Sequence, residues 1–296
     1  MTLLPRTART ARTVRAPRPN WALLIPALAL VAGVLLLPLL QSLFRSFGGV
    51  DFTLDHYKSL FTDGVTLTVL GRTAGTAVIV TVVTFLIGYP YAYLMTRVGP
   101  RLRGVLLVIV LVPFWTSVMA RNFAWIVLLQ RGGPVQSLFD ALGAGDVVFY
   151  GTVVGVTVAM SQVLLPFMVL PLFSTLSSID RKLLLAARGL GSSPIAAFWK
   201  VYWPLSRGGV VSGLILVFTL SLGFYVTPAL LGSPQQSLIA QLLAQRTTQI
   251  LDFAGASALG MLVLVVTLVL VVWANRIGGT ISAIGVVATS KAKDTP

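Results

Sequence analysis

Residues 177–207, SSIDRKLLLAARGLGSSPIAAFWKVYWPLSR, form a basic segment that also contains serine, glycine and proline at several positions. Apolar stretches without a charged residue flank it on both sides, at 147–176 and 208–231. A helix needs about 20 apolar residues to cross the hydrocarbon layer of a bilayer. The pattern therefore predicts two membrane-spanning helices that are joined by a short polar segment.

The composition indicates the same environment for the whole chain. Of the 296 residues, 56% are hydrophobic and only 10% are charged, whereas soluble domains carry about 25% charged residues. Cysteine is absent, all eight acidic residues are aspartates, and His56 is the one histidine. These counts exclude disulfides and thiolate metal sites and leave little for a metal centre or a general acid–base site. We therefore expect no catalytic residue, no metal, no cofactor and no enzyme activity in this chain.

Six stretches are long and apolar enough to span a membrane, which predicts an all-α integral membrane protein. The third contains Arg121, and the fourth contains Pro166 and Pro171, which should kink a helix. We expect the last five helices to form the core and the first to lie at the periphery. The predicted spans are Trp21–Phe44, Leu70–Thr96, Gly104–Leu129, Val147–Leu176, Gly208–Leu231 and Phe253–Asn275.

The net charge of +14 is distributed unevenly among the connecting segments. Sixteen of the 22 lysines and arginines lie in residues 1–20, 97–103, 177–207 and 276–296, and five lie in the alternate loops. Because an excess of lysine and arginine marks the cytoplasmic side, both termini are predicted to be cytoplasmic. The charge is then mainly a topology signal, so we expect no nucleic-acid partner. The predicted divisions are a basic cytoplasmic tail (1–20), a transmembrane domain (21–277) and a second cytoplasmic tail (278–296).

Two segments near the N-terminus have simple interpretations. Residues 1–20 could begin a signal peptide, but the apolar run that follows is long and lacks a clear cleavage site, which favours a retained span. The arginines of this tail should attract anionic membrane lipid. Residues 51–61, DFTLDHYKSLF, place apolar side chains near helical spacing and predict a short interfacial helix, in which His56 has no metal-binding partner.

Inside the basic segment, local chemistry predicts a first short helix. Asp180 is a suitable N-cap for a helix that begins at Arg181. Gly189 and Gly191 can end that helix, because glycine readily adopts the left-handed conformation found at helix C-termini.

A second helix should follow directly. Ser193 can cap it and Pro194 suits its first position, and we expect it to run to Pro204. Such a helix–turn–helix could bind DNA or merely connect two spans. Its predicted place in the cytoplasm, tethered to the membrane at both ends, favours the docking of a soluble protein.

At this point the chain resembles the permeases of ATP-binding-cassette (ABC) importers. Their cytoplasmic motif is Glu-Ala-Ala, three residues, Gly, nine residues, Ile, any residue, Leu-Pro. Residues 185–187 are Leu-Ala-Ala, Gly191 follows after three residues, and residues 201–204 are Val-Tyr-Trp-Pro after nine more. The spacing agrees throughout, but Leu185, Val201 and Trp203 depart from the motif. The loss of the acidic first residue leaves the polar contacts of docking open.

The resemblance implies that this segment couples the permease to an ATPase. It also implies three partners: a dimer of ABC ATPases, a second homologous permease and an extracytoplasmic solute-binding protein. The location would be the inner membrane of a bacterium. The residues expected to make the coupling contact are Leu185, Ala186, Ala187, Arg188, Gly189, Gly191, Ser192, Ser193 and Pro194.

Four further stretches resemble permeases of the spermidine/putrescine type. The resemblance covers about residues 20–277 and implies the type I ABC importer permease fold, half of a translocation path, and a polyamine as solute. Another small solute of the same importer class remains an alternative, as does a self-contained secondary carrier. The stretches are GYPYAYLMTR (88–97), PFWTSVMARNFAWIVLLQRGG (113–133), LLPFMVLPLFSTLSSID (164–180) and SLGFYVTPALLG (221–232).

The candidate path residues give mixed indications about the solute. Aromatic faces suit the ammonium groups of a polyamine, but no aspartate lies within a predicted span. Arg121, a charge in the interior of the third predicted span, should face protein or a wet cavity; a structural role is favoured over contact with solute. With no GxxxxGK[ST] phosphate loop and no acid at mid-span, active transport requires ATP hydrolysis by another chain. The path candidates are Phe114, Trp115, Arg121, Asn122, Trp125, Phe224 and Tyr225.

Overall fold

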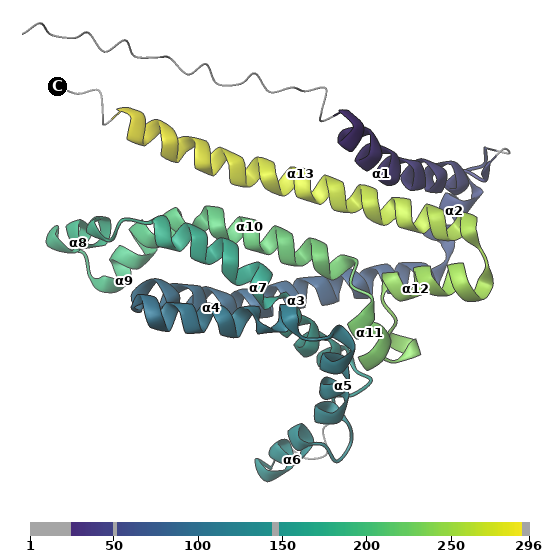
Figure 1. Cartoon of the computed structure of the whole chain (residues 1–296), viewed down its shortest axis with the longest axis horizontal. Coiled ribbons are helices and arrows are strands. Elements are labelled where there is room, and N and C mark those ends of the chain that lie inside the picture. Colours follow the sequence, from purple (N-terminus) through teal and green to yellow (C-terminus); the bar gives the residue numbers. More distant parts are fainter. Residues whose placement is uncertain (1–24, 50–51, 144–147, 292–296) are drawn as a thin grey trace, which may run out of the picture.

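The computed structural model describes residues 25–49, 52–143 and 148–291 (Figure 1). Every regular element in these ranges is a helix, which confirms the predicted all-α class. The basic tail 1–20, the start of the first predicted span and residues 292–296 lie outside the described residues, as does Val147, where the fourth span was expected to begin.

Within the described residues, five helices are long and apolar enough to cross a membrane, and the number is six if one bent pair of helices is counted as a single broken span. This agrees with the six predicted spans. The five are α1 (Ile25–Ser46), α3 (Gly64–Arg97), α7 (Val153–Ser178), the helix Pro194–Leu222 that ends in α10 (Trp203–Leu222), and α13 (Phe253–Lys291). The bent pair is α4 (Pro100–Trp115) followed by α5 (Val118–Leu129) and α6 (Pro134–Ala141).

Short helices complete the chain at the two ends of the bundle. At one end lie α8 (Arg181–Gly189) and α9 (Pro194–Ala197), and at the other lie α11 (Val226–Leu231) and α12 (Ile239–Gln245) (Figure 1). We call these the α8–α9 end and the α11–α12 end. Helix α2 (Asp55–Thr62) coincides with the predicted short helix of residues 51–61. Helix α13 continues through most of the predicted C-terminal tail.

Two of the predicted spans are interrupted, contrary to the sequence prediction. The third, expected to be one helix, turns by 100° between α4 and α5. Ser117 starts α5 by accepting a hydrogen bond from the Ala120 amide at 3.5 Å, so a new helix begins where the first one ends. The fifth span ends at Leu222 instead of Leu231, and the separate helix α11 follows after Gly223. Apolar composition continues across both breaks, so hydropathy alone does not locate them.

The main core lies where α3, α7 and α10 pack together. Met168 of α7 is fully buried and lies against glycines on both neighbouring helices. A Cβ atom added at Gly88 of α3 would lie 2.9 Å from Met168 Cγ, and one at Gly213 of α10 would lie 2.7 Å from Met168 Sδ. Gly209 allows a similar approach, because its added Cβ would lie 3.0 Å from the Pro171 carbonyl oxygen. Small residues let membrane helices approach closely, as they do here.

Helices α1 and α13 form a layer outside this core, and α13 packs against the core helix α10. Helix α1 packs against α13, and only 6% of the stretch Ala29–Ser46 is buried. This confirms the predicted peripheral position of α1. The expectation that α13 shares the core is wrong for the described residues. Two of its buried residues, Ala258 and Leu259, join a smaller cluster with Leu60 of α2, Val69 of α3 and two residues of α12. The chain therefore has one tight three-helix core and a looser outer layer.

Polar contacts fasten the α11–α12 end to α3. Arg72 donates hydrogen bonds to the carbonyl oxygens of Gln235 (2.7 Å) and Ser237 (3.3 Å). The amide of Ile239 donates to Thr73 Oγ1 at 2.9 Å. Beyond α12, Arg246 donates to the Asp63 carboxylate at 3.2 Å and to Thr66 Oγ1 at 2.8 Å. These bonds tie the segment between α11 and α13 to the N-terminal part of α3.

Candidate functional site

The first predicted coupling helix forms as the sequence indicates. Asp180 Oδ1 accepts a hydrogen bond from the Lys182 amide at 2.9 Å and starts α8. Gly191 has a φ of +89° and places the chain in the left-handed region. The amide of Gly191 donates to the Arg188 carbonyl at 3.0 Å and that of Ser192 donates to the Ala187 carbonyl at 3.1 Å. This pair of bonds is a Schellman motif, in which glycine meets the conformational requirement.

The second predicted coupling helix also starts as expected but does not end at Pro204. Ser193 Oγ accepts a hydrogen bond from the Ala196 amide at 3.2 Å, and Pro194 occupies the first turn of α9. After four residues the helix widens into a π-helical turn, η3 (Phe198–Tyr202), and continues as α10. The Trp203 amide bonds to the Phe198 carbonyl, which leaves Pro204 in the first turn of α10, where a missing N–H is tolerated.

The turn between α8 and α9 exposes large apolar side chains on the outside of the molecule. Leu190 is 89% exposed, Ile195 72% and Leu185 65%. They lie close in sequence to the basic residues Lys182 and Arg188. An apolar patch with a polar rim is typical of a surface that binds another protein.

A cluster of aromatic rings connects this segment to α3. Tyr93 meets Tyr202 edge to face at 5.4 Å between ring centroids, and Phe198 stacks on Tyr202 at 5.6 Å. One turn deeper, Tyr89 lies 5.5 Å from Trp203. The α8–α9 segment is thus attached to α7 and α10 by the chain and to α3 by these rings.

The sequence analysis missed this cluster. Tyr89 and Tyr93 are four residues apart in α3, and Phe198 and Tyr202 are four residues apart in η3. Side chains with this spacing share one face of a helix, so the pattern was readable, but it does not say which two faces meet. Between the segment and α3 there is a cavity of about 350 Å³, which the predicted coupling residues Leu185, Arg188 and Pro194 help to line.

Arg121 stabilises the bend in the third span. Its Nη1 donates to the carbonyl oxygen of Pro113 at 2.6 Å, in the last turn of α4. A positive side chain at the C-terminus of a helix satisfies carbonyl groups that have no partner within the helix. The neighbouring Asn122 is buried and donates to the Val118 carbonyl at 2.8 Å. The bond from Arg121 to the end of α4 gives this side chain a partner within the protein.

The candidate path residues do not gather at a single place. Phe114 and Arg121 line a cavity of about 150 Å³ with Phe167 of α7, whose ring lies 5.2 Å from that of Phe114. Trp125 is directed to another partner, Gln162, and donates to its Oε1 at 2.8 Å. The remaining candidates do not line this cavity: Trp115 is 76% exposed, Asn122 is buried, Phe224 packs against the main core and Tyr225 is half-exposed at the break between α10 and α11.

The chain is similar to one family of known transport proteins. Residues 85–281 match the family described as "Binding-protein-dependent transport system inner membrane component". The spermidine/putrescine transport system permease protein PotB of Haemophilus influenzae is 31% identical over 237 residues, which cover 78% of this chain and 82% of that protein. The chain belongs to this family.

Other members and a solved structure extend this assignment. The PotB permease of Escherichia coli is also 31% identical, over 77% of this chain and 84% of that protein. A chain in the crystal structure of a bacterial alginate ABC transporter, in complex with an alginate pentasaccharide-bound periplasmic protein, has the same fold. The TM-score is 0.73 at 18% identity, covering 87% of this chain and 92% of that chain. This family member is therefore a multi-pass inner-membrane permease with the type I ABC importer fold.

Proposed function

We propose that this permease imports a polyamine such as spermidine or putrescine, which an extracytoplasmic binding protein delivers. The PotB relatives carry that solute in their names, and the similarity covers most of both chains. A second homologous permease would supply the other half of the path. A dimer of separate ABC ATPases would supply the energy, so the proposal assigns no catalytic residue to this chain.

The exposed turn between α8 and α9 is the observation that carries the coupling proposal. Its Schellman motif fixes the direction of the chain between two short helices, and Leu190 and Ile195 project outward. This turn would sit in a groove of the ATPase. The absence of an acidic residue at Leu185 makes the contact more apolar than the family motif implies.

Movement of this turn would reach three helices at once. Helix α7 ends at Ser178, directly before α8, and the helix that starts at Pro194 runs without interruption to Leu222. The rings of Tyr93 and Tyr202 add α3 to this group. Closure of the ATPase dimer would therefore tilt the three-helix core as a unit and switch the path from inward-facing to outward-facing.

The path offers aromatic faces instead of carboxylates to a polyamine. Among the described spanning segments, only α6 contains an aspartate, Asp140, which lies next to its last residue. Phe114 and Tyr225 are exposed and could contact ammonium groups through cation–π interaction. Arg121, held at the end of α4, belongs to the scaffold in this proposal and not to the solute contact.

Substitution of Gly191 tests the coupling role. A Cβ atom there meets no other atom within 4 Å, but the φ of +89° disfavours an L-residue by about 1–2 kcal/mol. We expect Gly191→Glu to reduce uptake at least about tenfold at normal permease levels, because strain, bulk and charge enter the docking contact. Gly191→Asn tolerates this conformation and should retain most of the activity. Gly104→Ala, which has open space and an ordinary φ and lies outside the coupling segment, is the matched control.

Two measurements keep the coupling proposal and the solute proposal separate. ATPase binding to membranes that contain the Gly191→Glu permease reports on coupling; if binding and uptake equal the wild type, the segment is only a connector. Uptake of labelled spermidine by the complete complex reports on the solute. Transport of a different solute with no spermidine uptake would overturn the polyamine assignment and leave the coupling role intact.

Reporter fusions test the proposed orientation. Fusions after Thr96, after Leu176 and at the C-terminus should all report a cytoplasmic location, because the basic loops adjoin these positions. Thr96 and Leu176 lie at the same end of the bundle, since they line one cavity. An external location for any of the three fusions would contradict the topology.

A further inference from the structure

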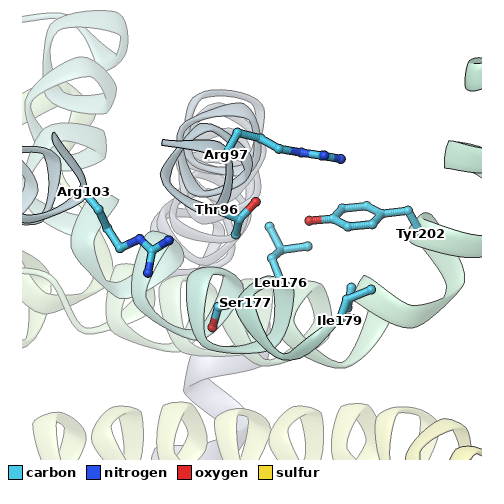
Figure 2. A pocket seen from close by; sticks show the side chains of 7 residues that line it. All are labelled: Thr96, Arg97, Arg103, Leu176, Ser177, Ile179 and Tyr202. Atoms are coloured by element: carbon cyan, nitrogen blue, oxygen red, sulfur yellow. The ribbon is translucent and has the colours of Figure 1, made fainter. Parts of the chain in front are cut away.

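Cavities at the two ends of the bundle differ in how their polar side chains are satisfied. Figure 2 shows the cavity at the α8–α9 end, in which the Arg97 guanidinium points away from Arg103 and the polar side chains have partners within the protein. Thr96 Oγ1 donates to the Tyr93 carbonyl at 2.7 Å, and Arg97 Nη2 donates to the Tyr93 hydroxyl at 2.7 Å. Arg103 Nε donates to the Met95 carbonyl at 3.1 Å. The lining of this cavity is therefore accounted for by the fold alone.

A larger cavity, at the α11–α12 end, has polar side chains without such partners. It has a volume of about 500 Å³ and lies between the last two turns of α1, the junction of α12 with η5 (Arg246–Ile250), and the first turns of α13. Ser42 of α1 and Ser257 of α13 line it, and neither hydroxyl bonds to any other described residue. Pockets of about 300–1,000 Å³ commonly hold small ligands. This cavity is therefore large enough for a ligand and has hydroxyl groups free to bind one.

Small residues of α13 create this space. Ser257 and Gly260 lie on one side of the helix and line the cavity. A Cβ atom added at Gly260 would lie 3.4 Å from Leu243 Cδ1 of α12, so a larger residue there would narrow the cavity. Phe253 and Leu39 also line it and are 46% and 39% exposed, so the cavity opens to the outside of the bundle. Because α1 and α13 are spanning helices, the medium outside them is the lipid bilayer.

The lining changes from polar to apolar along the helices. Phe253 begins α13, and Leu264, at the far end of the cavity, lies eleven residues further along the chain. At about 1.5 Å per residue, the cavity follows α13 for about 16 Å, close to half of the hydrocarbon layer of about 30 Å. The cavity therefore has the depth of one lipid leaflet, with a charged end at Arg45 and an apolar end at Leu39 and Leu264.

Arg45 stands at the charged end of the cavity without a carboxylate partner. It is exposed in the last turn of α1, and its guanidinium carbon lies 6.0 Å from the centroid of the Phe253 ring. No ion pair among the described residues includes Arg45. Asp252, next to Phe253, instead accepts a hydrogen bond from the Gly255 amide at 2.8 Å. A negatively charged group at this end of the cavity would therefore be attracted to Arg45.

We propose that this cavity binds one anionic phospholipid, with the phosphate at Arg45 and an acyl chain along the seam between α1 and α13. A guanidinium donates paired hydrogen bonds to phosphate oxygens. Ser42 and Ser257 lie about one helical turn deeper than the charged end, where the ester groups of a lipid follow its phosphate, and their hydroxyls can donate to the ester carbonyls. A free anion would leave the apolar end empty, and a hydrocarbon would leave Arg45 without a partner. A phospholipid satisfies both ends.

The shape of the cavity favours a single acyl chain over a protein helix. Spread over about 16 Å, the volume of about 500 Å³ gives a mean cross-section of about 30 Å², whereas a helix of about 10 Å diameter needs about 80 Å². A helix from another protein therefore does not fit unless α1 moves away from α13. Among the described elements α1 packs chiefly against α13, so a lipid in this seam would strengthen the main attachment of α1.

Lipid binding to the purified full-length permease tests the charged end. Native mass spectrometry in detergent would compare retention of phosphatidylglycerol with that of phosphatidylcholine of the same chain length. We expect the wild type to retain phosphatidylglycerol preferentially. Arg45→Gln should weaken that retention roughly fivefold, from the usual contribution of one basic residue near an anionic membrane surface. This variant should fold, since the Arg45 side chain is exposed and makes no hydrogen bond to a described residue.

Arg131→Gln is the matched control, because Arg131 is exposed on the connection between α5 and α6 and does not line the cavity. It should retain phosphatidylglycerol as the wild type does. Equal weakening by Arg131→Gln and Arg45→Gln would mean that the attraction is that of a general basic surface, and the proposal would be wrong. Equal retention of the two lipids by the wild type would also overturn it.

Filling the cavity tests the apolar end. Ser257→Leu places a larger apolar side chain in the space, whereas Ser257→Ala leaves it open and serves as the control. Thermal unfolding of the detergent-solubilised permease would be measured with phosphatidylglycerol of sixteen-carbon chains, with that of eight-carbon chains, and without lipid. We expect the longer lipid to stabilise the wild type and Ser257→Ala more than the shorter one does, and to stabilise Ser257→Leu little. Equal stabilisation of Ser257→Leu and the wild type, or equal effects of the two chain lengths, would contradict an acyl chain in this cavity.

Two further measurements identify other occupants. Sodium phosphate, compared with sodium chloride at the same ionic strength, should have little effect on thermal stability. Stabilisation by phosphate that phosphatidylglycerol does not increase would assign the site to a free anion. The assembled importer complex should retain phosphatidylglycerol as the separate permease does, and loss of the lipid on assembly would show that a partner subunit occupies the seam. Either result would overturn the proposal.

Discussion

The two ends of the bundle are fastened to α3 by different kinds of contact. At the α8–α9 end, Tyr93 and Tyr202 meet through their rings at 5.4 Å. At the α11–α12 end, Arg72 and Arg246 make hydrogen bonds of 2.7–3.3 Å to backbone and side-chain oxygens. Ring contacts tolerate small changes of angle and distance, whereas hydrogen bonds weaken steeply when they are misaligned.

This difference indicates how force can pass through the molecule. An end held by rings can follow a moving partner without losing its attachment to α3. An end held by directional hydrogen bonds keeps its register and can act as the fixed point of a tilt. If the proposed coupling holds, this comparison would assign transmission to the α8–α9 end and anchoring to the α11–α12 end. The three predictions below test it, beginning with the largest expected effect.

Removal of one ring should have the largest effect. Phe198 lies within 6.4 Å of Tyr89, 6.1 Å of Tyr93 and 5.6 Å of Tyr202, measured between ring centroids. Phe198→Ala should lower the free energy of unfolding by about 2–3 kcal/mol, below the full cost for a completely buried ring. It should also reduce uptake more than it reduces permease levels, because α3 loses its attachment to the coupling segment.

Trp199→Ala provides the control for this ring. Trp199 contacts the rings of Phe198 (5.5 Å) and Trp203 (5.6 Å), but it is 57% exposed and among the described residues has no ring contact with α3, so its removal should cost less than about 1 kcal/mol. Thermal unfolding in nanodiscs and uptake by the assembled complex are the two measurements. Equal losses for the two variants would mean that the cluster has no special role in transmission.

Loss of the ion pair at the opposite end should have an intermediate effect. The Arg246 side chain is 14% exposed and that of Asp63 is 36% exposed, so their pair is only partly screened by solvent. Arg246→Gln should lower the free energy of unfolding by about 1 kcal/mol. Lys58→Gln breaks the pair with Asp55, in which the two side chains are 75% and 77% exposed. This change should lower the free energy of unfolding by less than about 0.5 kcal/mol. Similar values for the two variants in thermal unfolding would remove the argument for an anchor.

The smallest effect concerns acid stability at the same end. The hydrogen bond from the Thr66 hydroxyl, with further bonds from the Val65 and Thr66 amides and the charge of Arg246, lowers the pKa of Asp63 below its ordinary value of 3.8. A carboxylate with a lowered pKa contributes stability above its unfolded pKa, and this contribution is lost as the pH falls through the folded value.

Asp63→Asn should therefore flatten the decline of thermal stability below about pH 4 by less than about 1 kcal/mol, since the side chain is partly exposed. Unfolding midpoints between pH 3 and pH 7 provide the measurement. Asp55→Asn, which changes an exposed acid on the neighbouring α2, should leave that decline as in the wild type. An unchanged slope in Asp63→Asn would show that the anchor does not depend on the charge of this residue.

The features that depend on a few neighbouring residues could be predicted from the sequence. The caps at Asp180 and Ser193, the proline at the start of α9 and the left-handed Gly191 follow from local hydrogen bonding and backbone sterics. The number of spans follows from apolar length. Each of these rules needs no knowledge of which helices meet.

The features that depend on tertiary contacts could not be predicted in the same way. Pro204 was expected to end a helix, but the π-helical turn before it shifts the bonding pattern and lets the helix continue. The bend between α4 and α5 depends on Arg121 reaching the Pro113 carbonyl eight residues back, a contact that no periodic pattern reveals. The aromatic residues of α3 and η3 were visible as pairs, but their meeting required the fold.

The position of Met168 has a consequence for how this protein can change over evolutionary time. One side chain fills the space above Gly88 on one helix and Gly213 on another, so the three positions share a single volume. A methyl group gained at either glycine can be accommodated only if the side chain at 168 becomes smaller or moves, and a smaller residue at 168 leaves space that both glycines would be free to fill. Substitutions at positions 88, 168 and 213 should therefore be correlated among homologous permeases. Those with alanine or serine at position 88 or 213 should carry a shorter residue at 168.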